Sequence, residues 1–562
     1  MLIGIDLGTT NSLAACFRDG AVQLIPNRLG QRLTPSVVSV AEDGTVYVGQ
    51  TAKERGARHP LETARVFKRS MGTDKVFTLG SKSFRAEELS SLVLRSLKED
   101  AESFLGEAVT EAIISVPAYF NDLQRKATKR AGELAGLTVS RIINEPTAAA
   151  IACGMDSAGQ TARYLGFDLG GGTFDVSILE LCGSIMEVHA IAGDNFIGGE
   201  DFTALLTTMF LERAAIAPES LEAHAMDEVY KAAERCKCAF SAQNEVTMRC
   251  AVEGQERELK LTLAEYEKAC APLLERLRRP IERSLRDAGI SLADIDQIVL
   301  VGGATRLPVI RRFVTKLFGR IPAMPVDPDE AVAIGAALQC GMKERNKEIS
   351  EIVLTDVCPY TLGTEVMVSN GLFDESGHYL PIIQRNTVIP VSRTQTVYTA
   401  HDDQTRVNVK ILQGESRMAY HNLLVGELSV PVPAAPKGQE AVEITYTYDV
   451  NALLEVEVLV RSTGVRRRII IQNEQNRISE EEAAARLALL QHLKQNPRQE
   501  ESNRLQLLRG ERLYEELPHR REEIDHAIME FERVLHRQDR TEIEKARKAL
   551  TRTLDAMEFG LT

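Results

Sequence analysis

No apolar run in this 562-residue chain approaches the length of a membrane span. Met1 leads directly into a predicted strand, without the charged segment and short apolar segment of a secretory signal. We therefore expect a cytoplasmic protein with no membrane partner. Positive charge is also in deficit, because 67 Lys and Arg stand against 80 Asp and Glu, for a net charge of −13. This balance argues against nucleic acid as a main partner.

Cysteine is sparse and odd in number. The nine cysteines are scattered through the chain, which is typical of reduced thiols and not of a disulfide framework. Cys236 and Cys238 suggest a metal site at first sight. They fall in a predicted helix from Asp227 to Ser241, where positions two apart diverge around the axis. Ordinary helix packing is therefore the preferred interpretation of this pair.

The most informative stretch is Tyr164–Asp175, an apolar run that ends in an aspartate, three glycines and a threonine. Glycine lets several backbone N–H groups approach one anion, so Gly170 to Gly172 predict a phosphate cradle. Asp168 and Asp175 flank the cradle and suit a hard cation such as Mg²⁺. If the three glycines stood alone in the chain, a simple hairpin turn would be the better interpretation.

A second copy of the pattern, Leu2–Thr10, changes this balance. Each copy runs into a predicted hairpin, one over Ser12–Ile25 with a turn at Asp19-Gly20, the other over Val176–Ile191 with a turn at residues 183–184. The repetition predicts two related half-domains that aim phosphate loops at one cleft. At this point the sequence resembles the superfamily of actin, sugar kinases and heat-shock ATPases.

Other segments extend the predicted α/β region to about Ser350. Glu145 precedes a proline at a helix start, where a carboxylate could face the cleft. Ile298–Arg306 forms another strand that ends in a glycine turn, and its Gly302 and Gly303 would allow a nucleotide base and ribose to approach the backbone. A chain of this length exceeds one core, so further domains are expected.

The hydrophobic period changes along the remaining chain. Glu351–Asp356 is a short apolar segment between acidic ends and is typical of a linker. From Val357 the period becomes two, as in Val407, Val409 and Ile411, which predicts an antiparallel β domain over residues 357–477. A capping box of Ser479 and Glu482 then opens a predicted helical region, residues 478–562, with a first helix over 483–493.

Three motifs, Ile5–Ser12, Asp168–Asp175 and Val301–Pro308, stand in family order and spacing. With them, the whole chain resembles the seventy-kilodalton heat-shock chaperone family of DnaK type. The resemblance implies an actin-like ATPase domain with duplicated half-domains (1–350), a linker (351–356), a β-sandwich peptide-binding domain (357–477) and a short α-helical lid (478–562). It also implies an ATP-dependent chaperone that binds apolar segments of unfolded polypeptides, with affinity gated by ATP binding and slow hydrolysis. The implied cofactors are ATP or ADP with Mg²⁺, and K⁺ as a further candidate.

The resemblance assigns roles to residues of the ATPase region. Lys68, Glu145, Asp168 and Thr173 would act in hydrolysis, and Asp6, Asp168 and Asp175 would order Mg²⁺ largely through water. The residues that match the adenosine pocket are Glu234, Lys237, Ser241, Gly302, Gly303, Arg306 and Asp329. Without the resemblance, Glu234 and Lys237 would be taken for a solvated pair on a helix surface. The implied nucleotide contacts are Thr9, Thr10, Asn11, Gly170, Gly171, Gly172, Thr173, Gly198, Gly199, Glu234, Lys237, Ser241, Gly302, Gly303, Arg306 and Asp329.

Two further groups follow from the same alignment of motifs. Met367 and Ala400 would form an arch over a bound peptide, and Val407 would line the pocket for one aliphatic side chain, although core packing alone also explains a valine there. A J-domain cochaperone is the implied partner. The positions implied for its docking or for interdomain coupling are Pro117, Arg125, Arg141, Asn144 and Asp356.

Departures from the family pattern indicate specialisation. Thr355 stands in the linker where DnaK-type proteins have leucine, and the Thr247–Leu261 hairpin is short, which makes a GrpE-type exchange factor doubtful. An insertion with a turn at residues 370–371 lies between Met367 and Asn386, and the lid is abbreviated. Together these features resemble the divergent HscC branch of bacteria.

Two other protein classes share the duplicated aspartate loops. A sugar kinase would use its remaining length for a sugar pocket with an aspartate base. An actin-like filament protein would end near Arg345. The β domain and helices predicted from Val357 onward favour the chaperone over both.

Overall fold

The computed structural model describes residues 1–56, 58–154, 162–182, 185–252, 255–344, 353–369, 374–449, 453–471, 497–499 and 501–559. The chain forms two compact units, Met1–Tyr360 with Gln384–Ile389, and Thr361–Ile383 with Pro390–Thr562. The turns expected at residues 183–184 and 370–371, and the capping box and helix expected over 479–493, lie outside the described residues. No helix within the described ranges is long and apolar enough to span a bilayer.

The first unit contains two six-stranded sheets, and the first two strands of each are paired in the same way. In each sheet an aspartate-bearing strand, β1 or β12, pairs antiparallel with the strand that follows the phosphate loop. The hairpin turn expected at Asp19-Gly20 is confirmed, with both residues at positive φ. The strands of the first sheet are β1 (Leu2–Asp6), β2 (Asn11–Arg18), β3 (Ala21–Ile25), β4 (Thr34–Pro35), β10 (Glu111–Val116) and β11 (Thr138–Asn144).

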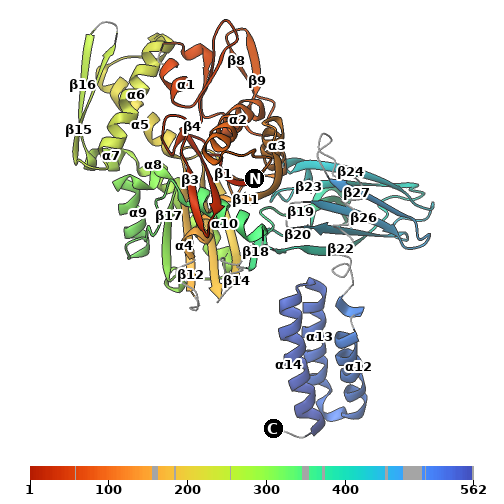
Figure 1. The fold of residues 1–562 in the computed structure, drawn as a ribbon. Helices are drawn as coiled ribbons and strands as arrows, with labels where there is room; N and C mark the ends of the chain where they lie inside the picture. The colour runs from red at the N-terminus through yellow and green to blue at the C-terminus, as the bar shows by residue number, and fades with distance from the viewer. Residues whose placement is uncertain are drawn as a thin grey trace. The chain divides into compact units, whose positions relative to one another are not determined.

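The second sheet has the order β17-β12-β13-β14-β18-β21 (Figure 1). The buried residues of its central strands are apolar apart from Asp168, Asp175 and Ser177, and Phe167, Phe174 and Val176 have no exposed surface. Such continuous apolar strands are expected where helices cover both faces of a sheet. The strands are β12 (Ala162–Leu169), β13 (Phe174–Cys182), β14 (Ile185–Asp194), β17 (Gln297–Val301), β18 (Val353–Val357) and β21 (Val388–Ile389).

The helix α10 (Ala331–Lys343) brings the two halves of the unit together by packing on β1, β2 and α4 (Glu145–Gly154). Its residues are small because the backbones approach closely. A Cβ on Gly335 would lie 1.8 Å from the Ala148 carbonyl oxygen, and a Cβ on Gly4 would lie 2.4 Å from the Ala337 nitrogen. Any larger side chain at these glycines would separate the elements that form the cleft.

Further elements of the first unit surround these sheets. These further elements are α1 (Gln50–Arg55), α2 (Ala86–Leu105), α3 (Asp122–Leu134), α5 (Gly199–Ala214), α6 (Ala223–Ala239), α7 (Leu263–Ala269), α8 (Ala271–Ala288), α9 (Pro308–Phe318), β5 (Val38–Val40), β6 (Val46–Val48), β7 (Thr63–Ala64), β8 (Val76–Leu79), β9 (Lys82–Arg85), β15 (Glu245–Val252) and β16 (Gln255–Thr262). Strands β6, β5 and β7 form a three-stranded sheet, and β8 pairs with β9. The predicted short hairpin is seen as β15 paired with β16.

The segment predicted as a linker contains a strand of the second sheet. β18 pairs parallel with β14, where Thr355 stands opposite Glu187, and antiparallel with β21. Backbone hydrogen bonding to a sheet satisfies the polar groups of this apolar segment. The segment Gln384–Ile389 is therefore part of the first unit, although in the chain it follows two strands of the second unit, β19 (Leu362–Ser369) and β20 (Asp374–Ile383).

The second unit begins with two four-stranded antiparallel sheets, in the orders β20-β19-β23-β24 and β22-β25-β26-β27. The period-two pattern is confirmed, since Val409, Ile411, Val442, Ile444 and Tyr446 are buried. The strands are β19 (Leu362–Ser369), β20 (Asp374–Ile383), β22 (Val391–Tyr398), β23 (Arg406–Gln413), β24 (Leu423–Pro431), β25 (Ala441–Tyr448), β26 (Leu454–Val460) and β27 (Arg466–Ile471).

Three helices end the described chain, α12 (Glu501–Glu516), α13 (Arg521–Arg537) and α14 (Arg540–Phe559), drawn in blue in Figure 1. The apolar positions spaced three and four apart form their shared core, which includes Ile524, Phe531 and Leu535 from α13 and Leu550 and Leu554 from α14. This spacing places one stripe of each helix against its neighbours.

Candidate functional site

A cleft of about 350 Å³ lies in the first unit, with residues of both half-domains in its walls. This volume suits a small-molecule ligand, for which clefts typically measure about 300 to 1,000 Å³. The tertiary structure gathers here most of the nucleotide-site residues that the sequence predicts. They are Asp6, Thr9, Thr10, Asn11, Lys68, Glu145, Asp168, Gly170, Gly171, Thr173, Gly199, Glu234, Lys237, Ser241, Gly302, Gly303, Arg306 and Asp329.

Asp6 and Asp168 stand at the ends of equivalent strands, at the floor of the cleft. Burial raises the pKa of Asp6 to about 7, and nearby Glu145 adds to the shift. Burial also raises the pKa of Asp168 well above its usual value, again with a contribution from Glu145. Ser115 donates a hydrogen bond to Asp6 Oδ1 at 2.8 Å, whereas Asp168 Oδ2 is buried and has no hydrogen-bond partner within the described part of the chain. These carboxylates form a negative site whose charge the nearby Lys68 ammonium offsets only in part.

Asp175 lies behind Asp168, directly opposite it in the β12–β13 ladder. Its Oδ1 accepts a hydrogen bond from the Tyr119 backbone N–H at 3.1 Å. Burial is the main cause that raises the pKa of Asp175 to about 7. The carboxylate therefore belongs to the same electrostatic cluster, one layer back from the cleft wall.

Lys68 and Glu145 form a buried ion pair, with Lys68 Nζ 2.7 Å from Glu145 Oε1. Lys68 comes from the short 3-10 helix Phe67–Ser70, and Glu145 is the first residue of α4. The Lys68 ammonium also lies 5.6 Å from the Phe120 ring centroid. A buried pair at a cleft wall holds a cation and a carboxylate in fixed positions, because removing either partner would leave a costly uncompensated charge.

Glycines shape the phosphate loops because the two loops touch. A Cβ on Gly171 would lie 1.7 Å from Thr10 Oγ1, and a Cβ on Gly198 would lie 2.5 Å from the Gly171 carbonyl carbon. Gly199, the first residue of α5, donates its N–H to the Gly170 carbonyl oxygen at 2.9 Å. The second loop is therefore held against the beginning of α5, where the helix dipole favours an anion. Gly172 and Gly198, also predicted as nucleotide contacts, are not among the residues that line the cleft.

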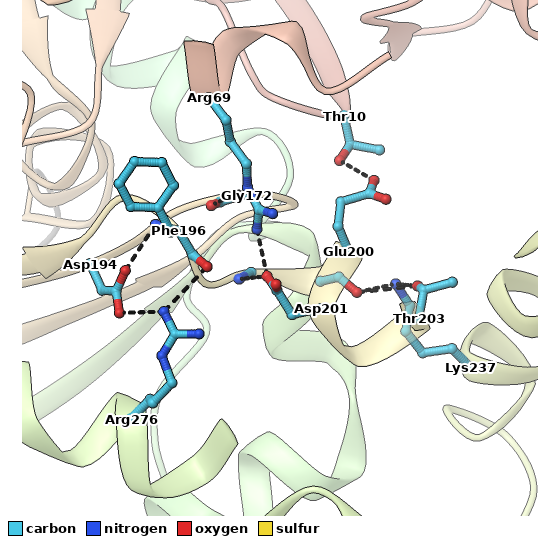
Figure 2. A network of polar contacts seen from close by, with 12 residues as sticks. Thr10, Arg69, Gly172, Asp194, Phe196, Glu200, Asp201, Thr203, Lys237 and Arg276 are labelled. Carbon is cyan, nitrogen blue, oxygen red and sulfur yellow. Dashed lines mark hydrogen bonds and ion pairs between the residues drawn. The ribbon is translucent and has the colours of Figure 1, made fainter. Parts of the chain in front are cut away.

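Figure 2 shows contacts around these loops that the sequence did not predict. Arg69, next to Lys68, donates Nε to the Gly172 carbonyl oxygen at 2.9 Å and forms an ion pair with Asp201. Asp201 Oδ2 also accepts the Gly198 N–H at 2.8 Å, which caps α5. The adjacency of Arg69 to Lys68 was the only signal in the sequence for this role.

Glu200 is a second residue that sequence reasoning missed. It lines the cleft and accepts hydrogen bonds from the Thr10 hydroxyl, at 3.2 Å, and from the Tyr230 hydroxyl. The first phosphate loop is thereby connected to α5 through the Thr10–Glu200 contact in Figure 2, and through Tyr230 to α6 of the other half-domain. An acidic residue directly after Gly198 and Gly199 was its signal in the sequence.

The far side of the cleft carries the residues predicted to hold adenosine. Lys237 Nζ lies 2.8 Å from Glu234 Oε2. It also donates to Thr203 Oγ1 at 2.8 Å, as Figure 2 shows. Arg306 Nε lies 2.9 Å from Asp329 Oδ2. A Cβ on Gly303 would lie 2.5 Å from Asp329 Oδ1, so only glycine leaves the carboxylate in place. Glu234 and Lys237 are thus part of a cleft wall and not a solvated surface pair.

The residues predicted for interdomain coupling lie outside the cleft, and three of them are connected. Arg125 Nη2 donates to Asn144 Oδ1 at 2.7 Å, and Asn144 Nδ2 donates to Asp356 Oδ2 at 2.8 Å. Arg141 instead donates to Gln339 Oε1 at 2.9 Å. Pro117 begins the loop whose Ala118 and Phe120 carbonyls accept hydrogen bonds from Arg125.

The predicted peptide-binding residues lie in the second unit. Met367 is on β19 and Val407 on β23, two paired strands of one sheet, and Ala400 follows β22 of the other sheet. All three side chains are half-buried, whereas Val409, two positions beyond Val407, is buried. Val407 is therefore more accessible than the core residues of the same strand.

The cleft residues fit a nucleotide with a hard cation. Carboxylate oxygens are the ligands that Mg²⁺ prefers, and the unpartnered Asp168 Oδ2 supplies one. Within the part of the chain that the structure describes, no group of three acidic, histidine or cysteine side chains is placed to hold a metal directly. The arrangement suits an ion that keeps several waters, as Mg²⁺ commonly does.

Comparisons with known proteins identify the family that the sequence motifs resemble. The model of the Hsp70 protein family matches residues 2–79 and 75–559. Chaperone protein DnaK of Thermotoga neapolitana is 41% identical over 501 residues, covering 86% of this chain and 82% of its own. Chaperone protein DnaK of Thermosipho melanesiensis is 40% identical over 495 residues, covering 86% of this chain and 81% of its own. With the cleft and the β unit in place, these matches show that the chain belongs to the Hsp70 family of ATP-dependent chaperones.

Proposed function

We propose that this cleft binds ATP with Mg²⁺ and hydrolyses it slowly, with Lys68 and Glu145 positioning the attack on the γ-phosphate. The observation that carries the proposal is the buried 2.7 Å ion pair between these residues in a wall shared with Asp6 and Asp168. Phosphoryl transfer depends mainly on positioning and on neutralising charge, so a fixed cation and carboxylate suffice. The alternatives of a sugar kinase or a filament protein are disfavoured, because the family match continues to residue 559.

The chain's own residues would divide the work. Thr9, Thr10 and the loop Gly170–Thr173 would bind the phosphates through hydroxyl and backbone N–H groups. Asp6, Asp168 and Asp175 would hold Mg²⁺ largely through water, and the ion would neutralise phosphate charge. The Glu145 carboxylate would orient the attacking water, while the Lys68 ammonium would stabilise negative charge on the γ-phosphate.

The test is a binding and turnover measurement on the full chain. Calorimetric titration with ATP should show binding that weakens when Mg²⁺ is chelated, and phosphate release should be slow and Mg²⁺-dependent. Absence of ATP binding, or phosphate release that proceeds equally well in chelator, would contradict the proposal. Replacing Na⁺ by K⁺ in the same assay tests the predicted role of K⁺.

We also propose that the second unit binds an apolar peptide side chain beside Val407. The half-buried state of this valine, on a strand whose neighbours at 409 and 411 are buried, supports the proposal. Burying one leucine-sized side chain stabilises a complex by about 1.5 to 3 kcal/mol. Val407→Phe should fill the space and remove about that much affinity for a leucine-rich peptide, as measured by fluorescence anisotropy. Unchanged affinity in a folded variant would show that Val407 is only part of the core.

Partners and location are proposed from the same framework. The connected residues Arg125, Asn144 and Asp356 support a surface for a J-domain cochaperone or for interdomain coupling. The eight-residue strands of the β15–β16 hairpin support nucleotide release without a GrpE-type factor. ADP release accelerated many-fold by GrpE would contradict this. The four-part domain division, cytoplasmic residence and the HscC-like assignment remain predictions of the sequence.

A further inference from the structure

The loop that follows β10 connects the carboxylate cluster at the cleft to Tyr360, which ends the long first segment, Met1–Tyr360, of the first unit. The backbone of Tyr119 is held on both sides, since its N–H donates to Asp175 Oδ1 at 3.1 Å and its carbonyl oxygen accepts the Tyr360 hydroxyl at 2.5 Å. Asn195 Nδ2 donates to the same carbonyl at 3.0 Å. One residue of the loop is therefore bonded both to Asp175, a member of the carboxylate cluster behind the cleft wall, and to Tyr360.

The side chains reinforce this contact. The rings of Tyr119 and Tyr360 pack with their centroids 4.7 Å apart and an interplanar angle of 41°. Arg283 Nη1 donates to the Tyr119 hydroxyl at 2.8 Å. Burial raises the pKa of Tyr360, so its hydroxyl keeps its proton and remains a donor. A tilted aromatic pair with a buried hydroxyl that finds a partner is a specific and well-fixed arrangement.

Tyr360 is also the residue at which the chain first crosses from one unit to the other. Thr361, its neighbour, is held inside the second unit by Glu415, which accepts the Thr361 N–H at 2.9 Å and its hydroxyl at 3.0 Å. Two consecutive residues are thus fixed in different units. A shift of the Thr361 backbone is passed to Tyr360 across one planar peptide bond, and only the few soft φ and ψ rotations beside that bond can absorb it.

From these contacts we infer that Tyr360 is a positioning residue for ATP hydrolysis, through which the peptide-binding unit acts on the Tyr119 backbone and so on Asp175. Its hydroxyl is the group that matters, since the hydroxyl is the atom bonded to the Tyr119 carbonyl. The inference deepens the proposed function and rests on hydrolysis occurring in this cleft. It adds a residue that touches neither nucleotide nor peptide and yet sets how strongly one affects the other.

The experiment compares ATP turnover of the full chain with and without saturating leucine-rich peptide. In Tyr360→Phe the ring stays and the hydroxyl is lost, so the ratio of stimulated to basal turnover should fall about fivefold, equivalent to about 1 kcal/mol, the usual worth of one hydrogen bond. The KM for ATP should remain within about twofold of the parent value, because no nucleotide contact is lost. Tyr360→Leu, which also lacks the hydroxyl, should show the same loss.

Tyr266→Phe is the matched control. It removes a buried tyrosine hydroxyl of the same unit that donates to a backbone carbonyl, that of Phe202, at 2.8 Å. It should keep the parent's stimulation ratio. Full stimulation in both Tyr360 variants would overturn the inference, and so would an equal loss in Tyr266→Phe, since the effect would then be general loosening. A parent protein without turnover would instead refute the proposed function on which the inference rests.

Discussion

The two phosphate loops present the same Asp-Leu-Gly pattern in different surroundings. In the first half-domain, Asp6 accepts a hydrogen bond from Ser115. In the second, Asp168 Oδ2 is buried and finds no hydrogen-bond partner among the residues that the structure describes, and Asp175 stands opposite Asp168 in the ladder. The duplication therefore supplies one carboxylate that the protein partly satisfies and a second that is left for a ligand. The two copies of the motif thus have different hydrogen-bonding surroundings within one cleft.

The largest expected effect concerns Lys68, whose ammonium group lies near the aspartates of both loops. Lys68→Ala should lower single-turnover hydrolysis by about a hundredfold to a thousandfold, the usual cost of losing one preorganised electrostatic group. ATP affinity should change little. Lys237→Ala is the matched comparison, because it removes another cleft lysine from the adenosine side and should weaken ATP binding more than it slows hydrolysis. Near-parental single-turnover rates in Lys68→Ala would remove that lysine from the mechanism.

The comparison of the loops is tested directly by paired substitutions. Asp168→Asn should raise the Mg²⁺ concentration needed for turnover by about ten to a hundredfold, because carboxylates that orient a metal's surroundings have effects of this size. Asp6→Asn should have the smaller effect, since Asp6 is already partly satisfied by Ser115. Mg²⁺ titrations of turnover in the two variants give the answer. Equal effects, or a larger one for Asp6→Asn, would show that the loops are equivalent.

The raised pKa values predict a pH dependence. Because Asp6 and Asp175 have a pKa of about 7, protons compete with Mg²⁺ below that pH. The Mg²⁺ requirement should rise about tenfold per pH unit for each such group that must be ionised, because metal ligands bind deprotonated. Titrations between pH 6 and 8 measure this. A requirement that stays flat over that range would contradict ionised Asp6 and Asp175 as the binding form.

In the nucleotide-free protein, the free energy of unfolding should fall as the pH rises, because Asp6 must then ionise in a buried site. The unfolded pKa of an aspartate is about 3.9, and the folded value for Asp6 is about 7. Its stabilising contribution is thus full below about pH 4 and is lost as the pH rises to about 7. Asp6→Asn should therefore gain melting temperature relative to the parent between pH 5 and 7.5. A constant difference across this range would show that Asp6 does not titrate there.

The smallest expected effect comes from removing the Ser115 hydroxyl, which supplies the hydrogen bond that distinguishes Asp6 from Asp168. Ser115→Ala removes the side-chain hydrogen bond that lowers the pKa of Asp6. One hydrogen bond contributes about 0.5 to 1.5 kcal/mol, so the Mg²⁺ requirement near neutral pH should rise about two- to tenfold. Thr128→Ala, which removes a buried hydroxyl bonded to the Gln124 carbonyl, is the control and should leave the Mg²⁺ requirement at the parent value.

Much of this protein could be predicted because its strongest signals are local. The apolar run before Asp168 and the three glycines after it determine a strand and a tight loop by backbone sterics alone. The alternation of Val407, Val409 and Ile411 predicts a half-buried strand in the same way. Glu145 at the start of a helix was also readable, since the following proline suits that position. These features needed no knowledge of distant contacts.

The segment around β18 shows where prediction from sequence stopped. Its apolar residues indicated that it would bury something, but its strand partners, β14 and β21, lie far from it in the sequence. The inclusion of Gln384–Ile389 in the first unit depends on the same pairing. Strand pairing between distant segments is decided by which surfaces remain unpaired after the sheets have formed, and no local pattern encodes it.

The sequence by itself determined the duplicated loops, the order of the domains and the chemical groups available for binding ATP. Only the tertiary structure decided which of those groups meet: that Lys68 faces Glu145, that Arg69 joins Gly172 to Asp201, and that Tyr360 reaches the Tyr119 carbonyl. The reason is physical. Local structure follows from the preferences of neighbouring residues, whereas the pKa of a buried carboxylate and the partner of a buried hydroxyl depend on packing among segments distant in the chain.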